Sequence, residues 1–271
     1  MTDLYAVIGN PIEHSKSPVI HSAFARQTGQ DIRYERLLGD LEEFEDDVET
    51  FFADGGRGLN VTVPFKERAF RLADTLSERA HDAGAVNTLA VRDEGLFGDN
   101  TDGVGLVRDL ACNHLFQLSG ARILLLGAGG AVRGVLRPLL DERPARLVIA
   151  NRTPAKALAL AAAAAARGNV LGCGLDELAG QRFDLIVNGT AAGLAAKVPE
   201  IPDDCLETGG WTYDMLYASE PTAFVLWGRA HGAGRALDGL GMLVEQAAES
   251  FRIWRGVAPD TGPVIAALRG A

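Results

Sequence analysis

The sequence contains little cysteine and no long hydrophobic run. Among its 271 residues are three cysteines, Cys112, Cys173 and Cys205, which lie far apart and form no C-x-x-C pair. An odd number of widely spaced cysteines favours a reducing compartment over a disulfide framework. No apolar run approaches the roughly 20 residues of a membrane-spanning helix, and the first residues lack the basic and apolar regions of a secretory signal. The sequence therefore predicts a cytoplasmic protein without a membrane partner.

Positive charge is also scarce. The chain has 26 Lys and Arg against 36 Asp and Glu, a net charge of −10. A protein that binds duplex nucleic acid neutralises phosphates with clustered Lys and Arg, so this balance argues against a nucleic-acid partner. An anionic metabolite stays compatible with it, because one pocket of donors is enough. The five histidines show no metal-ligand spacing, so no metal site is predicted and activity should survive chelators.

The composition is that of a globular protein with about two domains. With 47% hydrophobic and 23% charged residues the chain can form a real core, and roughly 150 residues per domain suggests two domains. In the first hundred residues short apolar runs alternate with amphipathic segments, which is typical of βα units. Strands are predicted at 5–9, 32–37 and 58–63, helices at 18–28 and 41–54, and a buried segment with a strand over 82–91, closed by 95–98.

The middle of the chain predicts a nucleotide-binding domain. Residues 122–127 form a continuous apolar run followed by a glycine-rich turn, and such a run is typical of a strand buried on both faces of a parallel sheet. Further helices are predicted at 132–140 and 154–167, and strands at 146–150 and 183–187. This alternation is half of a doubly wound domain. A last helical stretch opens at 239–243 and runs through 254, and a short helix ends near 268.

The glycine turn and the residues after the next strand favour an NADP site. In Gly127-Ala-Gly-Gly-Ala131 the missing side chains let backbone N–H groups approach a pyrophosphate, although Val132 stands where G-x-G-x-x-G has its third glycine. An NAD site would carry Asp or Glu about 20 residues on, whereas this chain has Asn151-Arg152-Thr153. A guanidinium can pair with a ribose 2′-phosphate that a carboxylate would repel, so NADP is favoured over NAD.

Plainer interpretations of these residues stay open. The glycines alone are also compatible with a tight βα turn, and Arg152 with a solvated surface residue. Residues 187–193 follow another apolar strand, and loops at this edge of an open α/β sheet bind ligands. That segment is equally compatible with a plain turn.

Two loops of the first domain carry polar side chains that suit a small anionic substrate. Ser15 and Ser17 share a loop before a predicted helix, where serine hydroxyls can bind an oxyanion or simply cap the helix. Thr62 and Lys66 lie near the end of the strand predicted at 58–63. A partly buried lysine can act in catalysis, although a lysine at a strand end is usually a surface residue.

Together these segments resemble the shikimate dehydrogenase family over nearly the whole chain. The matching motifs are, in chain order, G-x-P-x-x-H-S-x-S-P at 9–18, N-V-T-V-P-F-K at 60–66, G-A-V-N-T at 84–88, D-N-T-D-G at 99–103, G-A-G-G-A at 127–131, N-R-T at 151–153, Y-D-M-x-Y at 213–217 and D-G-x-G-M-L-x-x-Q-A at 238–247. Agreement at so many places in one order is not expected by chance.

The resemblance implies an α/β protein of two domains. A substrate-binding domain would span residues 1–103 and a Rossmann-like NADP-binding domain residues 104–238, with the cleft between them. The C-terminal helices, residues 239–271, would return to the substrate domain. The family similarity is compatible with a homodimer or a monomer.

The resemblance also implies roles for individual residues. Lys66 and Asp102 would form the catalytic pair. The substrate would be bound by Ser15, Ser17, Thr62, Lys66, Asn87, Asp102, Tyr217 and Gln246. The cofactor NADP would be bound by Gly127, Ala128, Gly129, Gly130, Ala131, Asn151, Arg152, Thr153, Lys156, Met215 and Gly239.

The implied reaction is the reversible, NADPH-dependent reduction of 3-dehydroshikimate to shikimate, a step in chorismate and aromatic amino acid biosynthesis. Hydride would move between the nicotinamide and the substrate ring, and Lys66 would exchange a proton with the attached oxygen. The alternatives are a quinate/shikimate or aminoshikimate-type dehydrogenase and a non-catalytic metabolite sensor of the same fold. Ser22, Ala191 and Ala223 depart from the usual family pattern, and none of them is assigned to chemistry.

Overall fold

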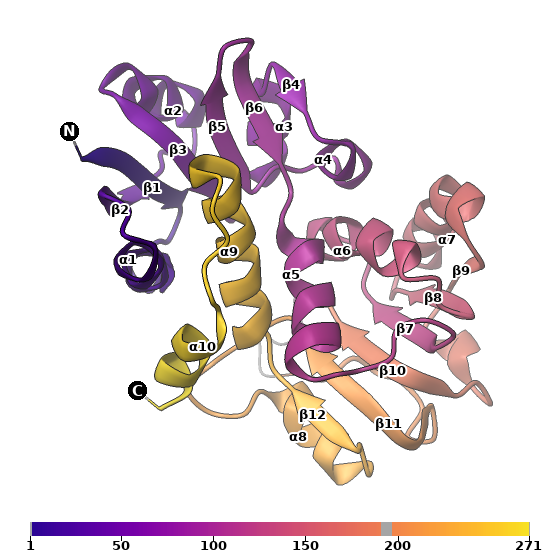
Figure 1. Ribbon diagram of the computed structural model, residues 1–271. Helices are drawn as coiled ribbons and strands as arrows, with labels where there is room; N and C mark the ends of the chain where they lie inside the picture. Colours follow the sequence, from indigo (N-terminus) through magenta and orange to yellow (C-terminus); the bar gives the residue numbers. More distant parts are fainter. Residues whose placement is uncertain (1, 191–196, 271) are drawn as a thin grey trace. The chain divides into compact units, whose positions relative to one another are not determined.

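The computed structural model describes residues 2–190 and 197–270. The chain divides into two compact units, residues 1–105 with 243–271 and residues 106–242. The boundaries fall within two helices, α5 (Asp102–Arg108) and α9 (Leu240–Arg255), which are labelled in Figure 1. Each unit is built around a six-stranded sheet. None of the helices in the described part of the chain has both the length and the apolar character that crossing a bilayer requires.

The first unit contains a mixed sheet. Its strands are β1 (Asp3–Gly9), β2 (Ile32–Leu38), β3 (Gly56–Val61), β4 (Thr75–Leu76), β5 (Thr88–Arg92) and β6 (Gly95–Asp99). They lie in the order β2-β1-β3-β5-β6-β4, and β5 runs antiparallel to both of its neighbours. The segment 95–98, which the sequence suggested as the end of a strand, is itself a strand, because Gly95 with φ 110° allows a tight hairpin from β5 into β6.

Helices cover both faces of the first sheet. They are α1 (Ser17–Thr28), α2 (Phe44–Ala53), α3 (Lys66–Leu72), α4 (Glu78–Ala83), the part of α9 from residue 243 and α10 (Gly262–Arg269). Successive side chains of a strand point to opposite faces. Ile8 of β1 therefore packs with α2 and α3, whereas Val7 packs with Tyr34 on the other face. Phe24 of α1 and Phe251 of α9 join another buried cluster.

The second unit contains a fully parallel sheet. Its strands are β7 (Arg122–Leu126), β8 (Arg146–Ala150), β9 (Val170–Cys173), β10 (Phe183–Asn188), β11 (Leu206–Asp214) and β12 (Arg235–Leu237). They lie in the order β12-β11-β10-β7-β8-β9, and each neighbouring pair is parallel. This is the strand order of a doubly wound dinucleotide-binding fold, in which ligands bind where the order reverses, here between β7 and β10.

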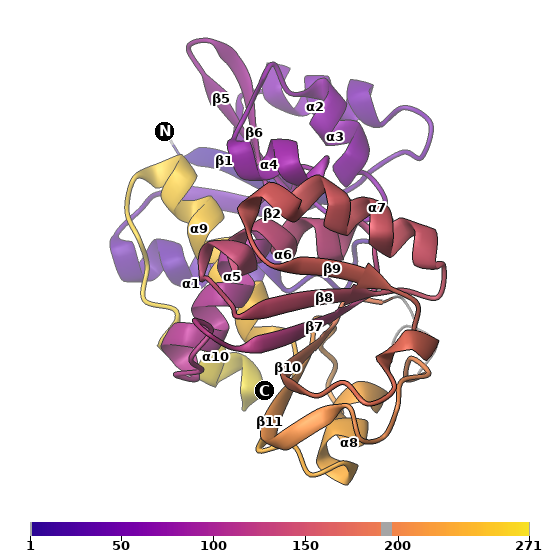
Figure 2. The same ribbon diagram turned by 90° about the vertical axis from the view of Figure 1, so that its right-hand side faces the viewer.

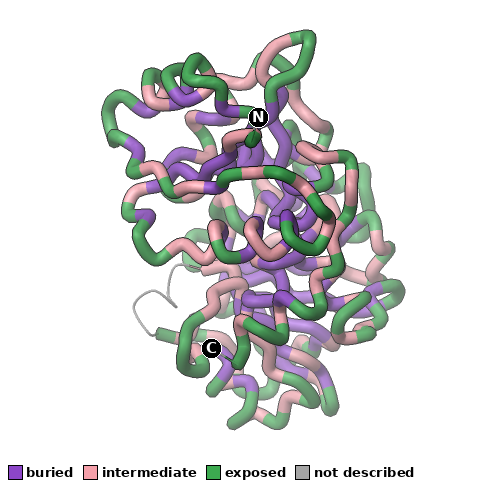
Figure 3. The backbone as a smooth tube through the Cα atoms, turned by 60° about the vertical axis from the view of Figure 1, so that its left-hand side comes forward, coloured by how far each residue is buried: buried purple, intermediate pink, exposed green. Residues whose placement is uncertain are grey.

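The apolar run of β7 is buried on both faces, as the sequence predicted. The helices of this unit are α6 (Gly130–Asp141), α7 (Pro154–Ala164) and α8 (Ala223–Ala230). Ile123 and Leu125 face the buried side chains of α6 and α7, whereas Leu124 and Leu126 lie in the cluster that contains Phe224 of α8. Figure 2 shows α7 and α8 on opposite sides of these strands, and Figure 3 shows that long buried stretches of the tube occur in both units.

Candidate active site

Lys66 lies at the start of helix α3 rather than at the end of a strand. Strand β3 ends at Val61, and the chain turns through Pro64 before the helix begins. The Nζ atom of Lys66 donates to Oδ2 of Asp102 at 2.6 Å. The lysine side chain is 28% exposed and the aspartate side chain 12%. This ion pair is therefore partly shielded from water, and an opposite charge at this distance holds the ammonium in one direction.

Asn87 and Gln246 complete a cluster around the Lys66–Asp102 pair. The Nδ2 atom of Asn87 donates to Oδ1 of Asp102 at 2.8 Å and lies 3.3 Å from Oε1 of Gln246. Asn87 is buried and lies in the segment that connects α4 to β5, and Gln246 belongs to helix α9. Both oxygens of the Asp102 carboxylate thus have a donor. Four of the sequence-predicted residues, from four segments of the chain, are in one hydrogen-bonded group.

Ser15, Ser17 and Thr62 lie in the same unit. Ser17 is the buried first residue of α1, and its N–H donates to Oγ of Ser15 at 3.3 Å. The carbonyl of Ser15 accepts two hydrogen bonds from the Arg36 guanidinium, at 2.6 and 3.0 Å. Thr62 follows β3, and its methyl group lies where a Cβ on Gly9 would fall, so the glycine admits this close approach. The Ser15 hydroxyl and carbonyl oxygens thus both accept hydrogen bonds from within the first unit.

A buried polar layer beneath Asn87 was not predicted from the sequence. The Nδ2 atom of Asn60 donates to Oγ of Ser250 at 3.0 Å and to the Asn87 carbonyl at 3.2 Å. Its Oδ1 accepts from the Tyr34 hydroxyl at 2.7 Å, and Thr88 contacts Ser250 at 2.7 Å. Asn60 stands alone as a polar residue within the apolar end of β3, and that was the available signal. Nothing in the local sequence indicates Ser250, which lies 190 residues away.

The glycine turn of the second unit leaves space at a helix N-terminus. Gly127 follows β7 with φ 108°, and α6 begins at Gly130. A Cβ on Gly129 would meet no atom within 4 Å, and one on Gly130 only the end of the flexible Arg133 side chain at 3.8 Å. The unpaired N–H groups of the first helical turn and the absent side chains fit a pyrophosphate. Ala128 lies in the same turn, and Ala131 lies in the first turn of α6.

Val132 occupies the third glycine position without closing the turn. Its side chain is fully buried in the core of the second unit. A Cβ on Gly189 would lie 2.6 Å from Cγ2 of Val132, so the glycine that permits close packing here is on the β10 side instead of the helix. With Gly189 making room for Val132, the chain can depart from G-x-G-x-x-G at this position while the glycine turn still connects β7 to α6.

Asn151, Arg152, Thr153 and Lys156 lie between β8 and the first turn of α7. Asn151 donates from Nδ2 to the Thr153 carbonyl at 3.0 Å. Arg152, Thr153 and Lys156 are exposed. The Arg152 side chain makes no hydrogen bond or ion pair with any residue in the described ranges. Neither Arg152 nor Lys156 has a carboxylate partner among residues 2–190 and 197–270, and two such positive side chains beside a helix N-terminus fit a phosphate group.

Met215 and Gly239 lie at the carboxyl end of β11. A Cβ on Gly239 would be 2.3 Å from the Met215 carbonyl oxygen, so only glycine fits there. The Met215 sulfur lies 3.1 Å from the Cβ position of Gly189. The segment 187–193 also belongs here. Val187 and Asn188 are the last residues of β10, Gly189 and Thr190 follow the strand, and residues 191–193 lie outside the described residues.

Buried Asp214 supports this edge and was not predicted from the sequence. Its carboxylate accepts from the Thr222 hydroxyl at 2.6 Å, from Asn188 Nδ2 at 3.1 Å and from the Leu216 N–H at 3.2 Å. Burial raises the pKa of Asp214 above its usual value. Tyr217, the remaining predicted substrate residue, follows this segment in the second unit, and burial raises the pKa of its hydroxyl.

Residues 2–190 and 197–270 contain no group of three or more His, Cys, Asp or Glu side chains placed to hold a metal ion.

Three family models match the chain in sequence order. Residues 7–89 match the shikimate dehydrogenase substrate binding domain, residues 109–196 match shikimate / quinate 5-dehydrogenase, and residues 239–269 match the shikimate 5′-dehydrogenase C-terminal domain. The chain belongs to the shikimate dehydrogenase family. Among curated members of this family, the shikimate dehydrogenase (NADP(+)) of Alkalilimnicola ehrlichii is 61% identical over 269 residues, 99% of each chain. That of Halorhodospira halophila is 58% identical over 273 residues, again 99% of each chain.

Solved structures of a shikimate dehydrogenase and of a second enzyme have the same fold. The shikimate 5-dehydrogenase of Thermus thermophilus, crystallised with NADP(H) and shikimate, is 32% identical with a TM-score of 0.88 over 99% of both chains. An Ael1 enzyme from Pseudomonas putida is 47% identical with a TM-score of 0.94 over 98% of both chains.

The departures from the shikimate dehydrogenase pattern are local. Ala223 opens α8, and Thr222 caps the helix by accepting from the Val225 N–H at 3.2 Å. Ser22 lies within α1. Ala191 lies outside the described residues. Ser22 lies within helix α1 and Ala223 is the first residue of α8, so neither belongs to the Lys66–Asp102 cluster.

Proposed function

We propose that this protein is a shikimate dehydrogenase that reduces 3-dehydroshikimate to shikimate with NADPH and catalyses the reverse reaction with NADP. The observation that carries the proposal is the partly buried ion pair between Lys66 and Asp102, 2.6 Å long and joined to Asn87. A lysine and a carboxylate in this arrangement can move a proton at a substrate oxygen. Relatives 61% and 58% identical over nearly the full chain, named shikimate dehydrogenase (NADP(+)), support both the activity and the cofactor.

Lys66 is the proposed acid and base. In the reduction its ammonium donates a proton to the oxygen that becomes the hydroxyl, and in the oxidation its amine takes that proton back. Asp102 holds the ammonium toward the reacting oxygen through the 2.6 Å contact. Bound NADPH supplies the hydride. The chain's own contribution is to orient the substrate and to supply the proton.

The remaining polar side chains of the cluster suit a small cyclic acid with several hydroxyls. Ser15 and Ser17, with help from Tyr217, are proposed to bind the carboxylate. Thr62, Asn87, Asp102 and Gln246 are proposed to bind the ring hydroxyls. The contacts of Asn87 with both Asp102 and Gln246 support the second group, because they point donors and acceptors toward one place before any ligand is bound.

The proposed cofactor site is in the second unit. Backbone N–H groups of residues 127–131 would bind the pyrophosphate, and Asn151, Arg152, Thr153 and Lys156 would bind the ribose and its 2′-phosphate. Met215 and Gly239 would contact the nicotinamide. The space beside Gly129 and Gly130 and the exposed, uncompensated charge of Arg152 support this assignment. The first unit is accordingly the proposed substrate domain, in a cytoplasmic homodimer or monomer.

The test is a rate measurement with four substrate and cofactor combinations. Purified protein is mixed with NADPH and 3-dehydroshikimate, and the loss of NADPH absorbance is followed. Parallel reactions replace NADPH by NADH, or run in the oxidative direction with NADP and either shikimate or quinate. We expect rapid turnover with 3-dehydroshikimate and NADPH and with shikimate and NADP, and much slower reactions with NADH or quinate.

The other possible outcomes would assign a different function to the protein. Equal oxidation of quinate and shikimate would make it a quinate/shikimate dehydrogenase. Binding of 3-dehydroshikimate without NADPH consumption would make it a sensor. As a further control we would offer 5-ketofructose, because a 5-ketofructose reductase of a Gluconobacter strain has the same fold, with 27% identity and a TM-score of 0.86. Faster reduction of 5-ketofructose than of 3-dehydroshikimate would contradict the proposal.

A further inference from the structure

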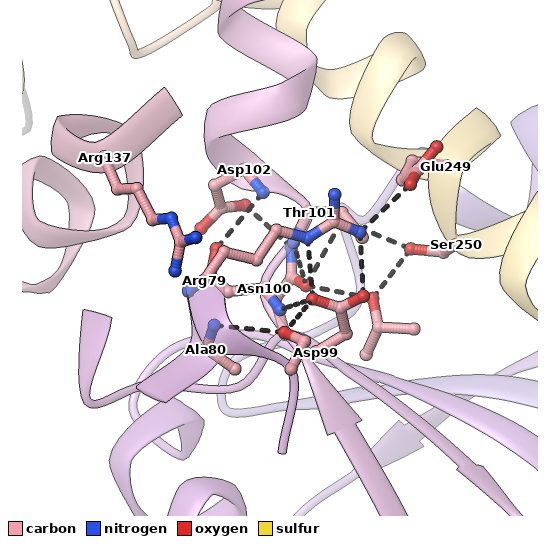
Figure 4. Close-up of polar contacts among 12 residues, drawn as sticks. Arg79, Ala80, Asp99, Asn100, Thr101, Asp102, Arg137, Glu249 and Ser250 are labelled. Atoms are coloured by element: carbon pink, nitrogen blue, oxygen red, sulfur yellow. Dashed lines mark hydrogen bonds and ion pairs between the residues drawn. The ribbon is translucent and has the colours of Figure 1, made fainter. Parts of the chain in front are cut away.

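Arg79 of helix α4 contacts two segments that carry proposed site residues. Its Nε and Nη2 atoms donate to the two carboxylate oxygens of Asp99, both at 2.7 Å. The same Nη2 atom donates to Oε1 of Glu249 at 3.0 Å. Figure 4 shows the guanidinium between the two carboxylates. The side chains of Asp99 and Glu249 are only 5% and 2% exposed, so both charges are buried.

Asp99 determines where the segment that carries Asp102 begins. It is the last residue of β6, three residues before the catalytic carboxylate. One of its carboxylate oxygens accepts from the N–H of Asn100 at 2.7 Å, and its carbonyl accepts from the N–H of Asn87 at 3.0 Å. The Asn100 side chain in turn accepts from the N–H of Asp102 at 3.2 Å. A displaced Asp99 would therefore move Asp102.

Glu249 lies one turn after Gln246 on α9. Residues three apart share a helix face, so the contact between Arg79 and Glu249 holds the face from which Gln246 projects. Gln246 accepts from the Thr101 hydroxyl at 3.3 Å and lies at the same distance from Asn87 Nδ2. The Arg79 guanidinium thus connects the end of β6 with α9. The end of β6 leads into the segment that carries Asp102 of the Lys66–Asp102 cluster, and α9 carries Gln246.

We propose that Arg79 is a positioning residue for the reaction, acting through Asp99 on Asp102 and through Glu249 on Gln246. This inference rests on the proposed function. Arg79 pairs with both buried carboxylates and offsets the repulsion between them, while Arg252 pairs with Glu249. A planar guanidinium can bind one carboxylate with two parallel hydrogen bonds and still reach a second, whereas an ammonium binds as a point charge.

The experiment compares Arg79→Lys with Arg252→Lys. Arg252 donates to the same Glu249 carboxylate, at 2.7 and 3.0 Å, but contributes no hydrogen bond to Asp99. For Arg79→Lys we expect kcat to fall about 10- to 100-fold, because a shift of the order of 1 Å in a positioned group has effects of that size. The KM for shikimate should rise, while the Kd for NADPH, measured by fluorescence, should stay unchanged. Arg252→Lys should stay within about twofold of wild type.

A second variant keeps the test decisive if Arg79→Lys does not fold. Arg79→Gln combined with Asp99→Asn removes one charge of each sign and leaves neutral hydrogen-bonding groups, and it should show the same loss of kcat in folded protein. The inference is overturned if Arg79→Lys has wild-type kcat and KM. It is also overturned if Arg252→Lys loses as much, or if the loss of kcat equals the loss of folded protein seen by circular dichroism with KM unchanged. Wild-type protein without shikimate dehydrogenase activity would overturn the proposed function and this inference together.

Discussion

The proposed substrate residues and the proposed cofactor residues are held in different ways. In the first unit both oxygens of the Asp102 carboxylate have donors, and Asn87 links Asp102 with Gln246. In the second unit the Arg152 side chain makes no hydrogen bond or ion pair with any residue that the structure describes, and the turn at Gly129 has open space around it. The proposed substrate residues are held in place by hydrogen bonds to one another, whereas the proposed cofactor residues leave positive charge and space available to a ligand.

This difference predicts how substitutions behave. Residues that share a hydrogen-bonded network affect one another, so their effects do not add. Exposed residues without neighbours act only through the ligand that they contact. Substitutions of the residues that orient Lys66 and Asp102 should therefore change kcat and KM together, and loss of Lys66 itself should lower kcat. Substitutions near Arg152 should change one cofactor contact and nothing else.

Replacing Lys66 should have the largest effect. Lys66→Ala removes the proposed acid and base, and kcat should fall about 10²- to 10⁴-fold, the usual contribution of such a group. Substrate affinity should stay comparatively intact. Steady-state rates of NADPH consumption measure both quantities. Lys197→Ala, at an exposed lysine, is the matched control and should be as active as wild type. A large rise in KM with unchanged kcat would instead make Lys66 a binding residue.

His21 tests whether water is excluded from the interior of the first unit. The imidazole is fully buried, stacks on Tyr34 with ring centroids 4.2 Å apart, and has no hydrogen-bond partner among the described residues. Burial lowers its pKa from 6.5 to about 3. Because the folded-state pKa lies below the unfolded one, the contribution to stability is present above pH 6.5 and is lost as the pH falls toward 3.

His21→Phe should therefore weaken the pH dependence of stability. Between pH 7 and about pH 4.5 the wild-type free energy of unfolding should fall by about 3 kcal/mol more than that of the variant, since each pKa unit is worth about 1.4 kcal/mol. Urea unfolding at the two pH values measures this difference. His81→Gln, at a histidine whose side chain is 77% exposed, should keep the wild-type pH dependence. Equal pH dependence in His21→Phe and wild type would show that water reaches the imidazole.

Arg152→Gln should affect only the cofactor side. A hydrogen bond to a charged group contributes about 1.5–3 kcal/mol, so the Kd for NADPH should rise about 10- to 100-fold. The Kd for NADH, which lacks the 2′-phosphate, and the KM for shikimate should stay unchanged. Isothermal titration with the two cofactors measures the effect. Equal losses for NADPH and NADH would contradict the assignment of Arg152 to the phosphate.

Much of the fold could be predicted because the central strands are buried on both faces. The strand predicted at 146–150 has the bounds of β8, Arg146–Ala150, and the alternation around it led to the doubly wound fold. β11 and α8 were missed. The sequence of β11 contains Gly209 and Gly210 and shifts its register against β10, so it lacks the continuous apolar run that identifies a buried strand.

The candidate site was predicted from motifs rather than from periodicity. The residues in contact with Asn87 include Gln246, which is 159 positions away, and no local pattern brings such residues together. The family resemblance supplied that grouping. It did not indicate Ser250 or Arg79, because a polar residue on a helix carries no local signal of a buried partner.

The most direct test of the paired Lys66 and Asp102 is a double-mutant cycle on kcat. Asp102→Asn should slow the wild-type enzyme strongly, because the carboxylate that directs the ammonium is lost. In the Lys66→Ala background the same change should alter kcat by no more than about threefold, since no ammonium remains to be directed. If the two losses multiply in the double variant, the two side chains act independently and the account is wrong.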